Sequence, residues 1–202
     1  MPYPSRPRPG DSIAEALRLR QAEGRPVRVG LIGAGQMGTD IIVQTALMTG
    51  IDVVAAADAI VDNVFAARAI AGSGAREPVG AEGSEAVSRA IACGQLAAVR
   101  SHRDVCTADG VDVVIDATGN PNVGAEVALA TIAAGKHIVM MNVEADVTIG
   151  AYLAAKAAEA GVVYTLGAGD EPTATMELVN FVRGLGYPIV AAGKGKNNAF
   201  RI

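Results

Sequence analysis

Three glycines in the first part of the chain have the spacing of a phosphate-binding turn. Gly33, Gly35 and Gly38 form the pattern G-x-G-x-x-G after an apolar, β-branched run. The first glycine permits a tight turn, the second lets backbone N–H groups approach a diphosphate, and the third lets a helix pack closely. The N-terminus of that helix adds the N–H groups of Gln36 and Met37 and a partial positive charge. The pattern predicts dinucleotide binding.

An acidic residue stands where the ribose partner of such a site is expected. Asp58 follows the predicted strand 52–57 and lies twenty residues beyond Gly38. A carboxylate there binds the ribose diol and repels a 2′-phosphate, which favours NAD. Asp58 could instead cap a helix that begins near Ile60. We therefore expect NAD(P)(H) as the cofactor and leave the choice between NAD and NADP open.

Further candidate cofactor contacts follow the end of the run 111–115. Ligands of open parallel sheets bind beyond the carboxyl ends of the strands. Gly119 would let the chain pass close to the cofactor, and Thr118 or Asn120 could donate hydrogen bonds to ribose or nicotinamide. In the alternative reading these residues form a turn, with Asn120 capping the next helix.

Polar and apolar side chains alternate in residues 142–146, directly after the run 137–141. Asn142 is a candidate cofactor contact, and Glu144 and Asp146 could hold Mg²⁺ or Mn²⁺, since such cations prefer oxygen ligands. Glu144 could also transfer a proton in catalysis. Alternatively, Asp146 caps the following helix and Glu144 is solvated in its first turn.

Two loops near the end of the chain carry more candidates. Asp170 lies in the glycine-rich loop 167–172 and could act in catalysis or as a metal ligand. Lys194 and Lys196, between glycines, could bind a phosphate or polarise a carbonyl. Solvated surface lysines are the simpler alternative.

The elements that must position these residues alternate along the chain. Ser12 begins a helix with a capping box. Further helices are expected over 36–48, 60–71, 82–92, 122–134, 148–160 and 173–185, and strands over 27–32, 52–57, 111–115, 137–141, 162–166 and 189–192. This alternation predicts an α/β fold with a doubly wound parallel sheet of the Rossmann type. We divide the chain into a tail and helix (1–24), a dinucleotide-binding domain (25–165) and the start of a substrate region (166–202).

Composition excludes several classes of protein. Of 202 residues, 50% are hydrophobic and 19% charged, which is unlike a disordered chain. The net charge of -4 gives no reason to expect nucleic acid or anionic lipid as a partner. No apolar run approaches the ~18 residues of a membrane span. Cys93 and Cys106 have no metal-site spacing, so we expect a reducing cytoplasm. A last strand without a neighbour would favour a homo-oligomer.

Several motifs carry a resemblance to a known family. The runs 33–38, 116–119 and 135–139 resemble the nucleotide-binding domain of homoserine dehydrogenases. The runs 140–146, 169–172 and 193–198 resemble the homoserine-dehydrogenase-like oxidoreductases with a C-terminal SAF domain, among them enzymes similar to 1-deoxy-D-xylulose 5-phosphate reductoisomerase. These relatives are longer, so the resemblance implies that this chain stops within the substrate region. Homoserine dehydrogenases usually have a lysine where this chain has Val143.

The resemblance implies an NAD(P)-dependent oxidoreductase of isoprenoid precursor synthesis. Its substrate would be a small polar or phosphorylated carbonyl or hydroxy compound, rearranged and then reduced. Homoserine dehydrogenase, of amino-acid biosynthesis, is the second enzyme reading. The third is a dinucleotide-binding module without catalysis, because a fold does not fix a function.

Overall fold

The computed structural model describes residues 12–168 and 171–193. The strands are β1 (Val27–Ile32), β2 (Ile51–Ala57), β3 (Pro78–Gly80), β4 (Leu96–Val99), β5 (Val113–Asp116), β6 (His137–Met140) and β7 (Tyr164–Leu166). The helices are α1 (Ile13–Ala22), α2 (Gln36–Thr45), α3 (Asp62–Ala71), α4 (Ser84–Ala92), α5 (His102–Thr107), α6 (Pro121–Ala133), α7 (Val143–Ala160) and α8 (Glu171–Gly184). A short 3-10 helix, η1, spans Gly72–Gly74.

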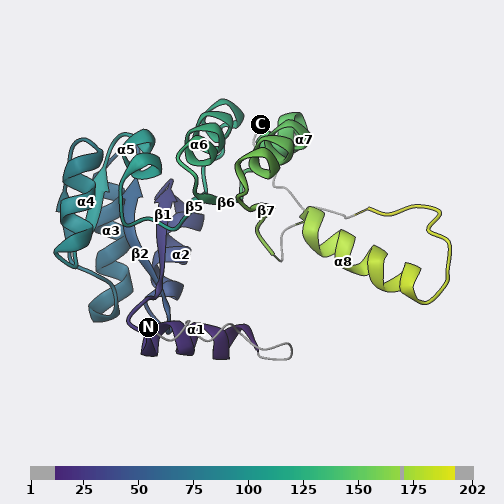
Figure 1. The fold of residues 1–202 in the computed structure, drawn as a ribbon, viewed down its shortest axis with the longest axis horizontal. Coiled ribbons are helices and arrows are strands. Elements are labelled where there is room, and N and C mark those ends of the chain that lie inside the picture. The colour runs from purple at the N-terminus through teal and green to yellow at the C-terminus, as the bar shows by residue number, and fades with distance from the viewer. Residues whose placement is uncertain (1–11, 169–170, 194–202) are drawn as a thin grey trace, which may run out of the picture.

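All strands of the described chain pair in parallel and form a single sheet (Figure 1). Their order is β3-β4-β2-β1-β5-β6-β7, so the chain reverses its direction of winding between β1 and β5. This is the predicted α/β, doubly wound fold. Ligands of such sheets bind at the point of reversal, beyond the carboxyl ends of the strands.

Small aliphatic side chains fill a core on both faces of the sheet. On one face, α2 and α3 pack through Ile42, Val64 and Ala67. On the other, α4, α5, α6 and α7 pack against the sheet, with Val127 and Leu153 fully buried. No helix within the described residues has the length and apolar character needed to cross a bilayer.

Three elements differ in kind from the sequence prediction. The strands β3 and β4 and the helix α5 were not predicted. In β4 the sequence Leu-Ala-Ala-Val has a weak strand preference, and its burial between β2 and β3 makes it a strand. These elements carry residues of the candidate site described below.

The end of the described chain also departs from the prediction. We expected a strand over 189–192, but these residues pair with no strand and Val190 is 96% exposed. A strand needs a neighbour for its ladder of hydrogen bonds, and β7 forms the edge of the sheet. Helix α8 lies on the β7 side of the sheet, far from α4 (Figure 1).

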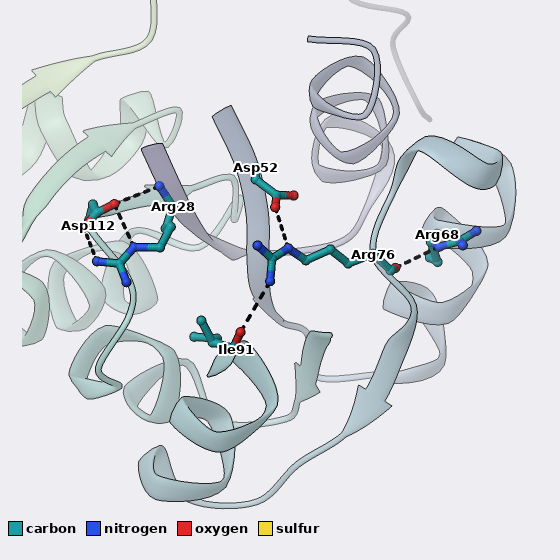
Figure 2. A network of polar contacts seen from close by, with 6 residues as sticks. All are labelled: Arg28, Asp52, Arg68, Arg76, Ile91 and Asp112. Atoms are coloured by element: carbon teal, nitrogen blue, oxygen red, sulfur yellow. Dashed lines mark hydrogen bonds and ion pairs between the residues drawn. The ribbon is translucent and has the colours of Figure 1, made fainter. Parts of the chain in front are cut away.

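Ion pairs fix the amino ends of the strands, opposite the expected ligand edge (Figure 2). Arg28 in β1 donates from Nε and Nη2 to Asp112, before β5, at 3.1 and 2.7 Å. Arg76 binds Asp52 in β2 and the carbonyl oxygen of Ile91, and its own carbonyl oxygen accepts from Arg68 at 2.8 Å. These three arginines stabilise the amino ends of the strands, at the edge of the sheet opposite the expected ligand edge.

Candidate functional site

A cleft of about 480 Å³ lies at the carboxyl edge of the sheet, where the winding reverses. The loops that follow β1, β2, β4 and β5 all contribute to its wall. Its lining includes Gly33, Gly35, Asp58, Thr118 and Gly119. Five of the residues predicted to contact a cofactor from three separate motifs therefore lie around one cavity.

The glycine turn has the geometry that its sequence predicts. Gly33 has φ +93°, and a Cβ on it would lie 2.9 Å from the carbonyl oxygen of Ala117. A Cβ on Gly38 would lie 1.9 Å from the carbonyl oxygen of Gly33, so only glycine lets α2 pack on the turn. A Cβ on Gly35 would meet no described atom within 4 Å. The space at Gly35 is open on the side of the cleft.

Helix α2 begins without a side-chain cap. It starts at Gln36, and its N-cap Gly35 offers no acceptor of its own. The first N–H groups of a helix have no partner within it, so those of Gln36 and Met37 remain for a ligand. Together with the positive end of the helix dipole, they favour an anion at the mouth of the cleft.

Asp58 connects the glycine turn to the loop after β2. Its Oδ2 accepts a hydrogen bond of 2.7 Å from the backbone N–H of Ala34. Its Oδ1 accepts from the backbone N–H of Ile60 at 2.8 Å and from Nδ2 of Asn63 at 3.1 Å. The alternative role of Asp58 as a helix cap is wrong: α3 begins at Asp62 with Val61 as its N-cap and no side-chain cap, so the bond to Ile60 lies in the turn before the helix. The carboxylate still lines the cleft, where a ribose would be bound.

A buried polar network holds the loop after β5. Asn142 is fully buried, and its Nδ2 donates to Thr118 Oγ1 at 3.2 Å and to the carbonyl oxygen of Asn120 at 2.9 Å. Its Oδ1 accepts from the backbone N–H of Ala145 at 3.1 Å, which makes it the N-cap of α7. Asn120 in turn caps α6, as its alternative reading expected. Asn142 thus links the ends of β5 and β6 and holds the Thr118 hydroxyl in place through a hydrogen bond.

Asp116 completes this network from the end of β5. It is fully buried, and its Oδ1 accepts from the backbone N–H and the hydroxyl of Thr118 at 3.0 and 2.7 Å. Its Oδ2 has no hydrogen-bond partner among the described residues. Burial raises the pKa of this carboxyl, and the hydrogen bonds from Thr118 oppose the shift.

The two acids after β6 have different surroundings. Helix α7 begins at Val143, so Glu144 and Asp146 both lie in its first turn and Asp146 is not the cap. Glu144 is exposed. Asp146 Oδ1 accepts a 2.6 Å hydrogen bond from the hydroxyl of Tyr164, and burial followed by this bond raises the pKa of Tyr164. In the part of the chain that is described, no three acidic, cysteine or histidine side chains are grouped as metal ligands.

Three of the predicted catalytic or metal-binding residues lie outside the described residues. They are Asp170, Lys194 and Lys196. Their positions relative to the cleft stay predictions.

The structure adds two residues that the sequence analysis did not single out. Arg100 and His102 follow β4 and line the cleft beside Asp58. His102 Nε2 lies 3.6 Å from Glu126 Oε2 on α6. They were missed because β4 was missed, and a strand at 96–99 is the signal that would have placed them at the ligand edge.

Comparison with protein families gives a match at the end of the chain. Residues 169–202 match the family described as Oxidoreductase DRL, catalytic domain. Among curated proteins, no relative matches the chain.

Solved structures of several oxidoreductases have a similar fold. An NAD-binding oxidoreductase from Klebsiella pneumoniae is 21% identical, with a TM-score of 0.54 over 80% of this chain and 39% of its own. The WlbA dehydrogenase from Bordetella pertussis, solved with NADH and UDP-GlcNAcA, is 22% identical, with a TM-score of 0.53 over 80% and 40%. A homoserine dehydrogenase from Thiobacillus denitrificans is 24% identical, with a TM-score of 0.50 over 70% and 29%.

The chain spans less than half the length of each of these structures. At these identities the likeness shows a shared Rossmann-type fold. The match at residues 169–202 is to an oxidoreductase catalytic domain, and the fold is one that these solved oxidoreductases share.

Proposed function

We propose that this chain binds the cofactor of an NAD(P)-dependent oxidoreductase. The observation that carries the proposal is the single cleft that brings the glycine turn, Asp58 and the loop after β5 together. Open space at Gly35 and the uncapped start of α2 suit a diphosphate at its centre. Asp58 then lies on the adenosine side and Thr118 on the nicotinamide side.

The substrate we propose is a small polar or phosphorylated carbonyl or hydroxy compound, handled in a reductoisomerase-like reaction on a ketose phosphate. Support comes from the resemblance of 169–172 and 193–198, which fall inside the matched oxidoreductase catalytic region. We assign residues 166–202 to this substrate region and 25–165 to the cofactor domain. Lys194 and Lys196 would bind the phosphate or polarise the carbonyl.

The bound nicotinamide would supply the hydride in this reaction. The chain's own residues would bind the cofactor and orient its reacting end. The backbone N–H groups at the start of α2 hold the diphosphate, and Asp58 fixes the turn that presents them. The network of Asn142, Asp116 and Thr118 fixes the floor beside the reacting end of the cofactor. A preorganised site of this kind lowers the cost of orienting the reactants.

A divalent metal is a separate part of the proposal. Glu144 has a free, exposed carboxylate at the carboxyl edge, and Asp146 keeps Oδ2 available while Oδ1 accepts from Tyr164. With Asp170 as a third ligand, these oxygens would suit Mg²⁺ or Mn²⁺. The ion would then polarise substrate oxygens, and Glu144 is the group placed to move a proton.

Two measurements test the proposal in sequence. NADH and NADPH are titrated by nicotinamide fluorescence, and at least one should bind in the micromolar range. Turnover is then measured with 1-deoxy-D-xylulose 5-phosphate with and without Mn²⁺. Metal-independent oxidation of homoserine would favour a homoserine dehydrogenase. Dinucleotide binding without turnover of either substrate would favour the non-catalytic module. Absence of dinucleotide binding in a folded sample overturns the proposal.

A further inference from the structure

Arg100 is the one described residue that lines two neighbouring clefts at the carboxyl edge of the sheet. The first is the cofactor cleft. The second, of about 600 Å³, lies beyond β3 and β4 and is lined by Val61, Gly80 and Ser101 among others. Arg100 therefore stands on the rim between them. Its side chain is exposed, and no described group forms a hydrogen bond or ion pair with its guanidinium.

The sheet register places Arg100 beside Asp58. Ala57 of β2 pairs with Val99 of β4, and each is the last residue of its strand. The ladder continues one step further, because the backbone N–H of Asp58 donates to the carbonyl oxygen of Val99 at 3.0 Å. Neighbouring strands lie about 4.8 Å apart. A cation is therefore held within reach of any group bound at Asp58.

The Asp58 carboxylate is occupied by hydrogen bonds from groups other than Arg100. Its two oxygens accept from the N–H groups of Ala34 and Ile60 and from the amide of Asn63, and no ion pair joins it to Arg100. Three donors spread and satisfy the negative charge of the carboxylate. The repulsion that Asp58 exerts on a nearby anion is thereby weakened, while the guanidinium keeps all its donors free.

The second cleft limits where an anion could bind. Glu82 and Asp104 also line it, and Asp104 Oδ2 accepts from the backbone N–H of Gly83 at 3.0 Å. Two carboxylates disfavour a phosphate deep in this cleft. The rim at Arg100, between these acids and the satisfied Asp58, is the place where positive charge is available.

We propose that Arg100 binds the 2′-phosphate of NADP(H) and gives the protein a preference for the phosphorylated cofactor. This inference rests on the proposed function, since it assumes that the adenosine lies beside Asp58. Guanidinium groups bind phosphates through paired, charge-assisted hydrogen bonds, which an unphosphorylated ribose cannot accept. Arg100 is thus a specificity-determining residue, and Asp58 alone does not make the site specific for NAD.

The test compares the dissociation constants of NADPH and NADH for the wild type and three variants. Arg100→Ala should weaken NADPH binding at least tenfold and change NADH binding less than twofold. Arg100→Lys should recover part of the loss. Arg103→Ala is the matched control, since Arg103 is an exposed arginine on the next turn that lines neither cleft. It should leave both constants unchanged. The melting temperature of each variant reports folding.

The outcomes separate this inference from the function on which it rests. If Arg100→Ala weakened the binding of NADPH and NADH equally, Arg100 would contact the adenine or the diphosphate. This result would overturn the 2′-phosphate assignment. No change with either dinucleotide would also overturn it. Failure of the wild type to bind either one would overturn the proposed function itself. Competition by 2′,5′-ADP but not by 5′-AMP, lost in Arg100→Ala, would support the assignment with no turnover needed.

Discussion

The Asp58 carboxylate and the backbone N–H of Ala34 are joined by a 2.7 Å hydrogen bond between the ends of two neighbouring strands. The same carboxylate accepts from Ile60 and Asn63 on its other oxygen. Asp58, which is expected to bind a ribose, therefore also stabilises the glycine turn through its hydrogen bond with Ala34. Binding and local stability should depend on it together.

Asp58→Asn should reduce both properties. The new NH₂ group accepts no hydrogen bond, so the backbone N–H of Ala34 or of Ile60 that faces it loses its partner. We expect the free energy of unfolding to fall by about 1–3 kcal/mol and dinucleotide affinity to fall with it. Urea denaturation and cofactor titration measure the two effects. Asp40→Asn, an exposed acid on α2, should change stability by less than about 0.5 kcal/mol. A wild-type affinity in Asp58→Asn would contradict this account.

Two glycine substitutions should separate folding from binding. Gly38→Ala places a Cβ 1.9 Å from the carbonyl oxygen of Gly33, so it should lower the melting temperature markedly. Gly35→Ala meets open space and has φ -69°, so the variant should fold like the wild type yet lose dinucleotide binding, because its methyl group occupies the diphosphate space. Gly184→Ala, also in open space, is the control for both. Normal binding by Gly35→Ala would argue against the diphosphate position.

Burial of Asp116 should make stability fall as the pH rises. Because its folded pKa is raised, the native state holds the proton above pH ~3.9, where the unfolded chain releases it. The free energy of unfolding therefore falls as the pH rises toward the folded pKa. The total loss is about 1.4 kcal/mol for each unit by which the folded pKa exceeds the unfolded pKa. Asp116→Asn keeps an acceptor for Thr118 and should remove this decline. Urea unfolding from pH 4 to 8 checks it, and parallel curves for the two proteins would refute it.

Sequence patterns predicted the parts of the fold that are local. The strand Val27–Ile32 and the turn that follows were predicted at their observed bounds, since a β-branched run and three spaced glycines are local signals. Strand β4 was not, because alanine-rich runs become strands only through burial between neighbours. Missing β4 hid Arg100 and His102 from the candidate site.

Long-range pairs were beyond the reach of the sequence. Asn142 was predicted to contact a cofactor, and only the fold shows it buried against Thr118 and Asn120, more than twenty residues away. The start of α7 at Val143 was likewise missed, since alternating acids resemble a loop until Asn142 is seen to cap them. Arg28 and Asp112 are 84 residues apart, and no local pattern joins them.

The Arg28–Asp112 pair should give a pH dependence opposite to that of Asp116, at the other end of β5. Burial would raise the pKa of Asp112, but the hydrogen bonds from Arg28 outweigh it and hold the pKa below its usual value. The native state therefore binds fewer protons than the unfolded chain near pH 3–4, and the stability from this pair is lost as the pH falls through the folded pKa.

Asp112→Asn should accordingly cost about 1 kcal/mol at pH 7, a modest value because the Arg28 side chain is 43% exposed. The difference from the wild type should shrink as the pH falls below about 3.9, because the unfolded wild-type chain then takes up a proton more readily than the folded chain. Urea unfolding at pH 3, 5 and 7 measures it. Glu159→Gln, which breaks the exposed pair with Lys156, should leave the free energy of unfolding unchanged within error at each pH. A loss in Asp112→Asn that is the same at pH 3 and pH 7 would show that packing of the side chain, and not its charge, stabilises the amino ends of the strands.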